Sequence, residues 1–322
     1  MECTKCDREA VMHAAYSGAH LCEPHLLESV ERRITRRIRE DALLPDDATP
    51  ADPVTWVLAL SGGKDSAVMT DVIADTFAAD PRVELVALTI HEGIEGYRDE
   101  SLAACRELVE GRDIRPHEVV DYADELGVEM DDVAQEDPLD MAPCAYCGVF
   151  RRTLLDDHAR RLDADLLLTG HNLDDEAQTA LMNVLEGDLE QMAKHFDASL
   201  GPLDERGAPA GDRVPRAKPL RDVPEKEIAL YARLADLPAH VVECPHASES
   251  FRDTLQDLLL ELEADHPGTR HSIMSGYEEL AAMAAEKYRD PTVDVGECVE
   301  CGAATRNDRC RSCQLLAAVA EN

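Results

Sequence analysis

The sequence predicts an α/β fold with a central parallel sheet and a small metal-binding module at each end of the chain. An apolar segment at 54–60 has the pattern of a buried strand, and it leads into a glycine-containing loop and then a helical pattern. This order is typical of a βα unit in a parallel sheet. Cysteine pairs near both termini have the spacing of tetrahedral metal sites. With 322 residues, the chain is long enough for about two domains.

The terminal modules each contain two pairs of ligands with two residues inside each pair. The ligands are Cys3, Cys6, Cys22 and His25 at one end and Cys298, Cys301, Cys310 and Cys313 at the other. Such pairs let two tight turns close around one tetrahedral ion, so we expect two Zn²⁺ ions. Because the protein supplies all four ligands, both sites are predicted to be structural. His13 and His20 compete with His25 as ligands, but the spacing favours His25.

An arginine-rich helix is expected over 26–42, and with the first module it makes up a unit at 1–45. Its basic residues are Arg32, Arg33, Arg36, Arg37 and Arg39. Two interpretations stay open. The helix is either a solvated face with acidic partners such as Glu28 and Glu40, or a stripe that binds phosphate. A linker rich in Pro and Asp follows at 45–53.

The loop after the first strand has the composition of a phosphate site. It reads Ser61, Gly62, Gly63, Lys64, Asp65 and Ser66, and a helix is expected at 67–79. Glycines let the backbone approach phosphate closely, and the N–H groups at a helix N-terminus favour an anion. The loop differs from the Walker pattern of other nucleotide-binding proteins. A next strand is expected at 83–90.

Three of the remaining cysteines are candidates for chemistry. Cys144 and Cys147 form a pair before a helix expected from about residue 149, and Cys244 follows almost a hundred residues later. Spacing alone leaves three possibilities open: a third zinc site, a dithiol that carries persulfide or redox equivalents, and an iron–sulfur cluster. Cys105 lies in a helical pattern and is predicted to be a small buried hydrophobic residue.

Charge and hydropathy restrict the class of protein. The chain has 67 Asp and Glu against 32 Lys and Arg, a formal net charge of −35, and most of the basic residues are arginine. Dispersed acidic charge predicts a protein of a halophilic organism, because salt at 1 M screens repulsion over ~3 Å. An ordinary acidic protein is the alternative, and charge alone argues against a nucleic-acid partner. Lacking apolar runs of ~18 residues or a signal-peptide pattern, the chain is expected to be cytoplasmic, without a membrane segment.

Residues 61–66 resemble the PP-loop of the ATP pyrophosphatase superfamily. The resemblance continues through 83–98, 168–177 and 216–227, and with both cysteine modules the chain is similar to the TtuA/NcsA group of tRNA 2-thiouridine synthetases. It implies a Rossmann-like PP-loop domain at 54–245, a helical segment at 246–292 and a zinc ribbon at 293–322. Helices are expected at 251–263 and 273–288, and a mobile loop near RNA at 185–214.

The resemblance implies a reaction. ATP adenylates the C2 oxygen of a tRNA uridine, sulfur then replaces the activated oxygen, and AMP and pyrophosphate are released. The expected target is wobble uridine 34. Alternatives are thiolation of uridine 54 or of cytidine, lysidine or amide formation, and a non-catalytic zinc-ribbon protein that binds RNA or acts as a scaffold.

The resemblance also implies ligands and roles. ATP would contact 61–66, Ile90, His91, Gly170 and Asp175; relatives usually have Asp where His91 stands, so no carboxylate role is carried over. Cys144, Cys147 and Cys244 would hold a [4Fe–4S] cluster.

Two further residues receive roles from the resemblance. Arg151 is assigned to the α-phosphate, with a surface salt bridge as its alternative. Asp175 is assigned as the catalytic carboxylate that binds Mg²⁺ or orients the base, and Asp174 is the competing choice. His171 is expected to form hydrogen bonds within its loop.

The implied partners are tRNA, a ubiquitin-like sulfur carrier protein with its activating enzyme, and a second copy in a homodimer. RNA contact is expected at the arginine clusters of 32–39, 151–152 and 213–221.

Overall fold

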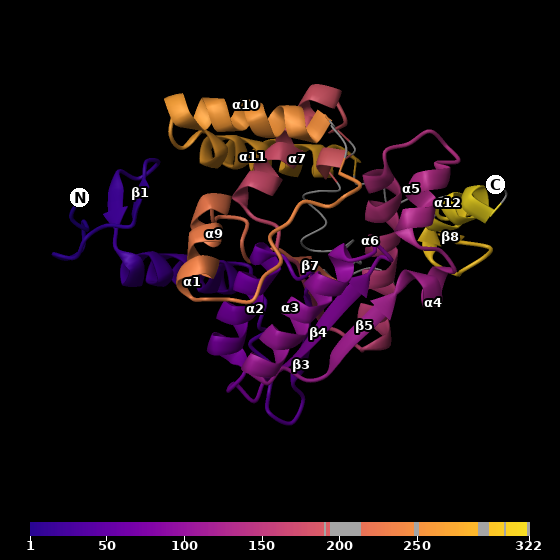
Figure 1. Cartoon of the computed structure of the whole chain (residues 1–322), viewed down its shortest axis with the longest axis horizontal. Helices are drawn as coiled ribbons and strands as arrows, with labels where there is room; N and C mark the ends of the chain where they lie inside the picture. Colours follow the sequence, from indigo (N-terminus) through magenta and orange to yellow (C-terminus); the bar gives the residue numbers. More distant parts are fainter. Residues whose placement is uncertain (190, 194–213, 248–250, 289–295, 306, 321–322) are drawn as a thin grey trace.

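The computed structural model describes residues 1–189, 191–193, 214–247, 251–288, 296–305 and 307–320. Its centre is a parallel sheet with helices on both faces, which confirms the predicted fold class (Figure 1). The loop expected at 185–214 lies largely outside the described residues. No helix of the described part is long and apolar enough to cross a membrane.

The sheet has five strands in the order β5-β4-β3-β6-β7, and all neighbours are parallel. They are β3 (Val54–Ala59), β4 (Val83–His91), β5 (His117–Asp121), β6 (Leu166–Leu168) and β7 (Arg216–Ala217). Trp56 of β3 pairs with Leu85 of β4 and Leu166 of β6. Such continuous apolar strands are typical of parallel sheets that are covered on both faces.

Side chains alternate between the two faces of the sheet. Trp56 and Leu58 enter one hydrophobic core, and Val57 enters the other. The first core contains α1 (Glu23–Glu40), α2 (Lys64–Phe77), α3 (Tyr97–Arg112) and α9 (Glu225–Leu234); the second contains α4 (Tyr122–Leu126), α5 (Met130–Glu136), α6 (Pro143–Arg161) and α12 (Arg311–Ala320).

The strand order predicts a ligand-binding site, called the crevice below, at the carboxyl edge of the sheet. The chain runs from β3 outward through β4 and β5, and then returns to β6 on the other side of β3. Ligands of open α/β sheets bind at such a topological switch point. The loops at 60–63, 92–96 and 169–172, which follow β3, β4 and β6, therefore meet at one edge.

Three further helices form a layer over this edge of the molecule. They are α7 (Leu173–Glu186), α10 (Phe251–Asp265) and α11 (Thr269–Tyr288). Leu173 and Ala177 of α7 share a hydrophobic core with Leu259 of α10 and with Met274 and Tyr277 of α11. Helices α10 and α11 thus pack on α7, as Figure 1 shows.

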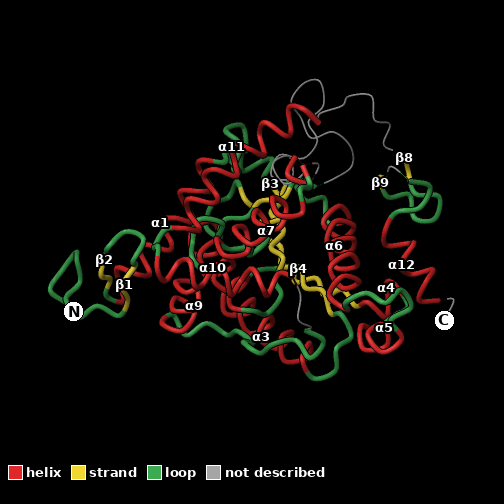
Figure 2. Tube along the Cα trace, turned by 90° about the horizontal axis from the view of Figure 1, so that it is seen from above, coloured by secondary structure: helices red, strands yellow, loops and turns green. Residues whose placement is uncertain are grey.

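The terminal modules lie at opposite ends of the molecule (Figure 2). The first contains an antiparallel hairpin of β1 (Met12–Ala14) and β2 (Ala19–Leu21), and the second contains β8 (Gly296–Glu297) and β9 (Ala304–Thr305). The helix after each module, α1 or α12, packs on the sheet domain.

One helix boundary differs from the prediction in a way that affects the site. The helix expected from about residue 149 begins at Pro143, so Cys144 and Cys147 lie in its first two turns. The fixed φ of Pro143 is suited to the first helical position. Because residues three apart share a face of a helix, α6 presents both cysteines on one side.

Candidate active site and metal sites

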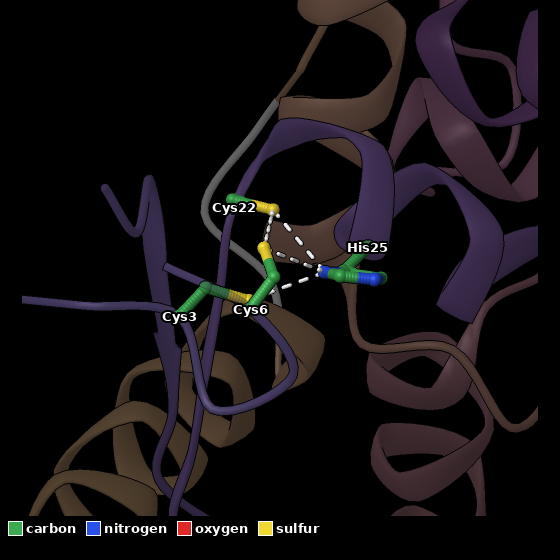
Figure 3. A group of neighbouring side chains, drawn as sticks. All are labelled: Cys3, Cys6, Cys22 and His25. Atoms are coloured by element: carbon green, nitrogen blue, oxygen red, sulfur yellow. Dashed lines mark hydrogen bonds between the residues drawn. The ribbon is translucent and has the colours of Figure 1, made fainter. Parts of the chain in front are cut away.

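The first terminal module brings its four predicted ligands together (Figure 3). Nδ1 of His25 lies 3.3 Å from Sγ of Cys3, 3.6 Å from Cys6 and 3.3 Å from Cys22. The Cys6 and Cys22 sulfurs are 3.7 Å apart. A tetrahedral zinc with bonds of about 2.3 Å to sulfur requires edges close to these lengths.

His13 and His20, the two competing ligands, stack on each other with ring centroids 4.3 Å apart. His25 rather than either of them completes the group of four ligand atoms that all lie within 4.8 Å of one another.

The second terminal module has the same arrangement with four sulfurs. Cys298, Cys301, Cys310 and Cys313 also place one ligand atom each within 4.8 Å of the others. The amide of Cys310 donates to Sγ of Cys298 over 3.2 Å and lowers the pKa of that thiol to about 6. The thiolate, which is the metal-binding form of cysteine, is therefore favoured.

The arginine-rich helix uses several of its guanidinium groups within the chain. Arg33 pairs with the buried Glu227 of α9, and Arg37 pairs with Asp222 at 2.7 Å. Arg36 lies 3.8 Å from Glu40, as the interpretation of a paired helix face predicted. These contacts fasten α1 to α9, and they leave Arg33 and Arg37 engaged with carboxylates of this chain.

The loop at 61–66, called the phosphate loop below, is ordered by hydrogen bonds among its own residues. Oγ of Ser66 accepts from the Ser61 amide at 3.1 Å and donates to the Gly63 carbonyl at 3.0 Å. Gly62 has a φ of +82°, and a Cβ there would lie 2.4 Å from the Ser101 carbonyl oxygen. Only glycine fits this position, and Gly63 is the N-cap of α2, whose N-terminal amides lie at the loop.

Charged side chains surround this loop. Nζ of Lys64 lies 2.9 Å from Asp65 and 2.7 Å from Glu225. The Asn172 amide donates to Asp65 at 2.9 Å. Burial raises the pKa of Asp65, while Lys64 opposes this shift. A Cβ at Gly170 would lie 2.9 Å from the Ser66 amide nitrogen, so the loop after β6 packs directly on the phosphate loop.

Asp174 and Asp175, the two candidates for the catalytic carboxylate, have different partners in the structure. Asp174 has an ion pair to Arg270 at 2.9 Å, and its other oxygen accepts from the Glu225 amide at 2.8 Å. Asp175 accepts from the Asn172 backbone amide at 3.1 Å and pairs with Arg252 of α10 at 3.1 Å, and its side chain is 33 % exposed. Asp174 therefore ties α7 to α9 and α11, whereas the more exposed Asp175 ties the start of α7 to α10.

The three candidate cysteines come from two segments. Cys144 is exposed and Cys147 is buried in α6, while Cys244 is half-buried in the loop after α9 and packs against the core that contains Cys147. Burial raises the pKa of Cys244, and the nearby Cys144 adds to this shift. Among the described residues, only the two terminal groups satisfy the 4.8 Å spacing; these three thiols are farther apart than a single zinc ion requires.

Arg151 lies one helical turn after Cys147 and touches it. Its Nη2 donates to the Cys147 sulfur at 3.1 Å, and its Nε donates to Glu92 at 2.7 Å. Arg151 therefore forms a salt bridge, as in the expected alternative, although its partner Glu92 is buried.

Sequence reasoning missed two acidic residues near the cysteines, Glu92 directly after β4 and Asp131 in α5. Glu92 binds Arg151, and Asp131 accepts both the Glu95 amide at 2.9 Å and His246 at 2.5 Å, close to Cys244. An acidic residue directly after a buried parallel strand was the available signal for Glu92.

Two histidines near the crevice form contacts within the chain. Nδ1 of His91 lies 3.2 Å from the carboxylate of Asp121. A carboxylate is therefore next to residue 91, although residue 91 is a histidine in this chain. His171 contacts Thr169 at 3.0 Å, in agreement with the predicted loop hydrogen bond.

Comparison with known proteins identifies the family. The PP-loop domain family matches residues 27–240, and the N-terminal LIM domain of 2-thiouridine synthetase TtuA matches residues 2–27. The tRNA 2-thiolation protein NcsA of Haloferax volcanii is 65% identical over 320 residues, which cover 99% of each chain. The chain belongs to the tRNA 2-thiolation protein family. This confirms the resemblance to the TtuA/NcsA group.

Other members of the tRNA 2-thiolation family are more distant in sequence. Cytoplasmic tRNA 2-thiolation protein 1 of Bos taurus is 35% identical over 98% of this chain and 87% of its own length. A solved structure, the U34-tRNA thiolase NcsA from Methanococcus maripaludis with its [4Fe-4S] cluster, superposes with a TM-score of 0.80 at 32% identity. It covers 98% of this chain and 95% of that one.

Proposed function

We propose that this protein is an ATP-dependent sulfurtransferase that replaces the C2 oxygen of a tRNA uridine by sulfur. The observation that carries the proposal is a series of contacts that joins Ser61 of the phosphate loop, through Arg98, Glu92 and Arg151, to the sulfur of Cys147. A 65% identical relative is a tRNA 2-thiolation protein. If the PP-loop had lost catalysis, the hydrogen bonds that order it around Ser66 and the ion pairs of Lys64 would serve no reaction.

The first step activates a poor leaving group. The uridine C2 oxygen attacks the α-phosphorus of ATP, an O–P bond forms, the bond from the α-phosphorus to the bridging oxygen breaks, and pyrophosphate leaves. The amides at 61–66 and at the start of α2 bind the phosphates. Arg151 offsets the negative charge that develops on the α-phosphate, since preorganised cations stabilise such transition states.

Asp65 and Asp175 are the carboxylates that would bind Mg²⁺ beside these phosphates. Asn172 lies between them, because its side-chain nitrogen donates to Asp65 at 2.9 Å and its backbone amide donates to Asp175 at 3.1 Å. Oxygen ligands from one or two carboxylates together with substrate phosphates are typical of magnesium sites.

The second step exchanges oxygen for sulfur. Sulfide attacks C2 of the adenylated uridine, the C2–O bond breaks, and AMP leaves with the bonding electrons. Cys144, Cys147 and Cys244 would hold a [4Fe–4S] cluster, whose iron without a cysteine ligand can accept the incoming sulfide. Their wide spacing favours a cluster over a third zinc ion, and the Methanococcus maripaludis relative contains such a cluster.

Several finer points complete the proposal. The wobble position is favoured because that same relative is described as a U34-tRNA thiolase. A cytoplasmic location agrees with the names of the eukaryotic relatives. A thiocarboxylate carrier with its activating enzyme, and a homodimer, remain expectations from the family resemblance.

Incubation of the anaerobically purified protein with tRNA, ATP, Mg²⁺ and sulfide tests the function. We expect AMP, pyrophosphate and 2-thiouridine in equal amounts, with mass spectrometry of tRNA fragments locating the sulfur at position 34. Sulfur at position 54 would correct the target. Absence of AMP with fully loaded protein would overturn the proposal and favour an RNA-binding scaffold.

The terminal groups are proposed to hold structural zinc. Replacing Cys22 by serine is expected to lower the zinc content by about one ion per chain, because a structural site with three ligands binds far more weakly. Hydrogen exchange should then speed up in residues 1–25 and stay slow in β3 and β4. The matched control is Cys105→Ser, which alters a buried cysteine outside both groups. Unchanged zinc content in Cys22→Ser would contradict the assignment.

A further inference from the structure

Glu92 is a buried carboxylate between two arginines. Its side chain is 2 % exposed, one oxygen lies 2.7 Å from Nε of Arg151, and the other forms an ion pair with Arg98. Burying charges is costly unless they are paired, and replacing such groups by apolar residues is often neutral for stability. The triad therefore calls for a reason other than stability.

The triad connects two parts of the site. Arg98, itself 6 % exposed, donates to the Ser61 carbonyl at 3.0 Å and to the Ile90 carbonyl at 2.6 Å. On the other side, Arg151 donates to the Cys147 sulfur at 3.1 Å. One continuous set of contacts thus runs from Ser61, the first residue of the phosphate loop, to Cys147, one of the three cysteines proposed to hold the cluster.

The exposure of Arg151 explains why it needs a partner. Its side chain is 45 % exposed, in contrast to Glu92 and Arg98. A half-exposed arginine samples many rotamers in water, and holding it in one costs side-chain entropy. The ion pair at Nε fixes the plane of the guanidinium while its outer nitrogens remain directed to Cys147 and the crevice.

We propose that Glu92 is a positioning residue for the thiolation reaction, which acts by orienting Arg151 between Cys147 and the phosphates. Arg98 holds Glu92 in the same frame as the phosphate loop. This inference rests on the proposed function, because that function places the reacting α-phosphate of ATP next to Arg151. Glu92 touches neither ATP nor sulfur itself.

A double-mutant cycle tests the inference. We expect Glu92→Gln to lower kcat of thiolation by about 10–100-fold, because misplacing a catalytic group by 1 Å can cost ~10²-fold. KM for ATP should change less than about twofold, since the loop amides remain. In an Arg151→Ala background, Glu92→Gln should cause no further loss. Two independent losses that multiply would overturn the proposal, as would full activity of Glu92→Gln.

A second readout avoids turnover altogether. In protein that retains its zinc but lacks the iron–sulfur cluster, the rate at which iodoacetamide alkylates Cys147 is measured by mass spectrometry. Glu92→Gln and Arg151→Ala should change this rate by the same factor, and the double variant should change it no further. Because this cycle needs no tRNA, it still tests the positioning role if the proposed function fails. Multiplying factors here would also overturn the inference.

The chain offers a matched control for the loss of a buried carboxylate. Glu227 is fully buried and pairs with Arg33 of α1 and with Tyr16, outside the contacts that link the phosphate loop to Cys147. Glu227→Gln should lower the melting temperature and leave both kcat and Cys147 alkylation unchanged. If Glu92→Gln does not fold, Glu92→Asp, which keeps the charge and shortens the reach, replaces it in both cycles with the same expected coupling.

Discussion

Replacing Cys244 by serine is expected to abolish tRNA 2-thiolation without unfolding the protein. The residue is half-buried in a loop outside every helix and strand, so serine fits the same space. A hydroxyl is a far poorer iron ligand than a thiolate, and even partners of metal ligands cost 10–100-fold when they are changed, so the loss should exceed about 100-fold. Mass spectrometry of the tRNA measures 2-thiouridine, and visible absorbance follows the cluster.

Cys105→Ser is the control for this experiment. Cys105 is fully buried and its thiol donates to the Leu60 carbonyl at 3.6 Å, a bond that serine can also form. Its replacement should cost less than about 2 kcal/mol of stability and leave absorbance and activity intact. If Cys244→Ser kept both activity and absorbance, Cys244 would have no role in sulfur transfer.

Features encoded by local spacing were predictable from the sequence. The ligand pairs of both modules lie within 25 residues of one another, so spacing alone indicated that they would converge. The strand, glycine loop and helix at 54–79 were also predictable, because each is set by a short pattern. The start of α6 lies earlier than predicted, because Pro143 is compatible with the first helical position and the helix therefore includes the cysteine pair.

The contacts within the site join residues that are far apart in the sequence, so sequence patterns could not predict them. Arg98 reaches back 37 residues to the Ser61 carbonyl, and Arg151 reaches 59 residues to Glu92. Both contacts exist only because β3 and β4 are neighbours and α6 covers that face. Arg98 was seen as part of a motif, but its partner could not be named without the sheet order.

The net charge was the least reliable guide to the partner. Taken alone, −35 argued against nucleic acid, whereas the family is one of tRNA 2-thiolation proteins. Total charge describes the solvent-facing surface, while binding depends on local groups. Several arginines in the expected clusters are occupied: Arg37 binds Asp222, and Arg216 binds Asp156 at 2.6 Å. Shape and hydrogen bonding must therefore supply much of the affinity for RNA.

Substitutions at the adjacent residues Asp175 and Asp174 are expected to separate an effect on catalysis from an effect on stability. Asp175→Asn is expected to lower the rate of AMP formation by about 10²–10³-fold, because a charge beside the reacting phosphates is lost. The melting temperature should fall less than in Asp174→Asn, since the Asp175 side chain is one-third exposed and an asparagine oxygen can still accept from the Asn172 backbone amide. If Asp175 binds Mg²⁺, the variant should also need a higher Mg²⁺ concentration for half-maximal rate. Single-turnover assays across a Mg²⁺ series measure both effects.

Asp174→Asn should do the reverse. Its carboxylate is 11 % exposed, and it pairs with an Arg270 side chain that is 10 % exposed. Removing the charge leaves a buried guanidinium with only Glu263, at 3.6 Å, as a carboxylate partner among the described residues. We expect a loss of roughly 2–4 kcal/mol in the free energy of unfolding. At a temperature where the variant is folded, AMP formation should stay within about threefold of wild type, because Asp174 faces α9 and α11 and not the phosphates. A large rate loss in folded Asp174→Asn, with a normal rate in Asp175→Asn, would exchange the two roles.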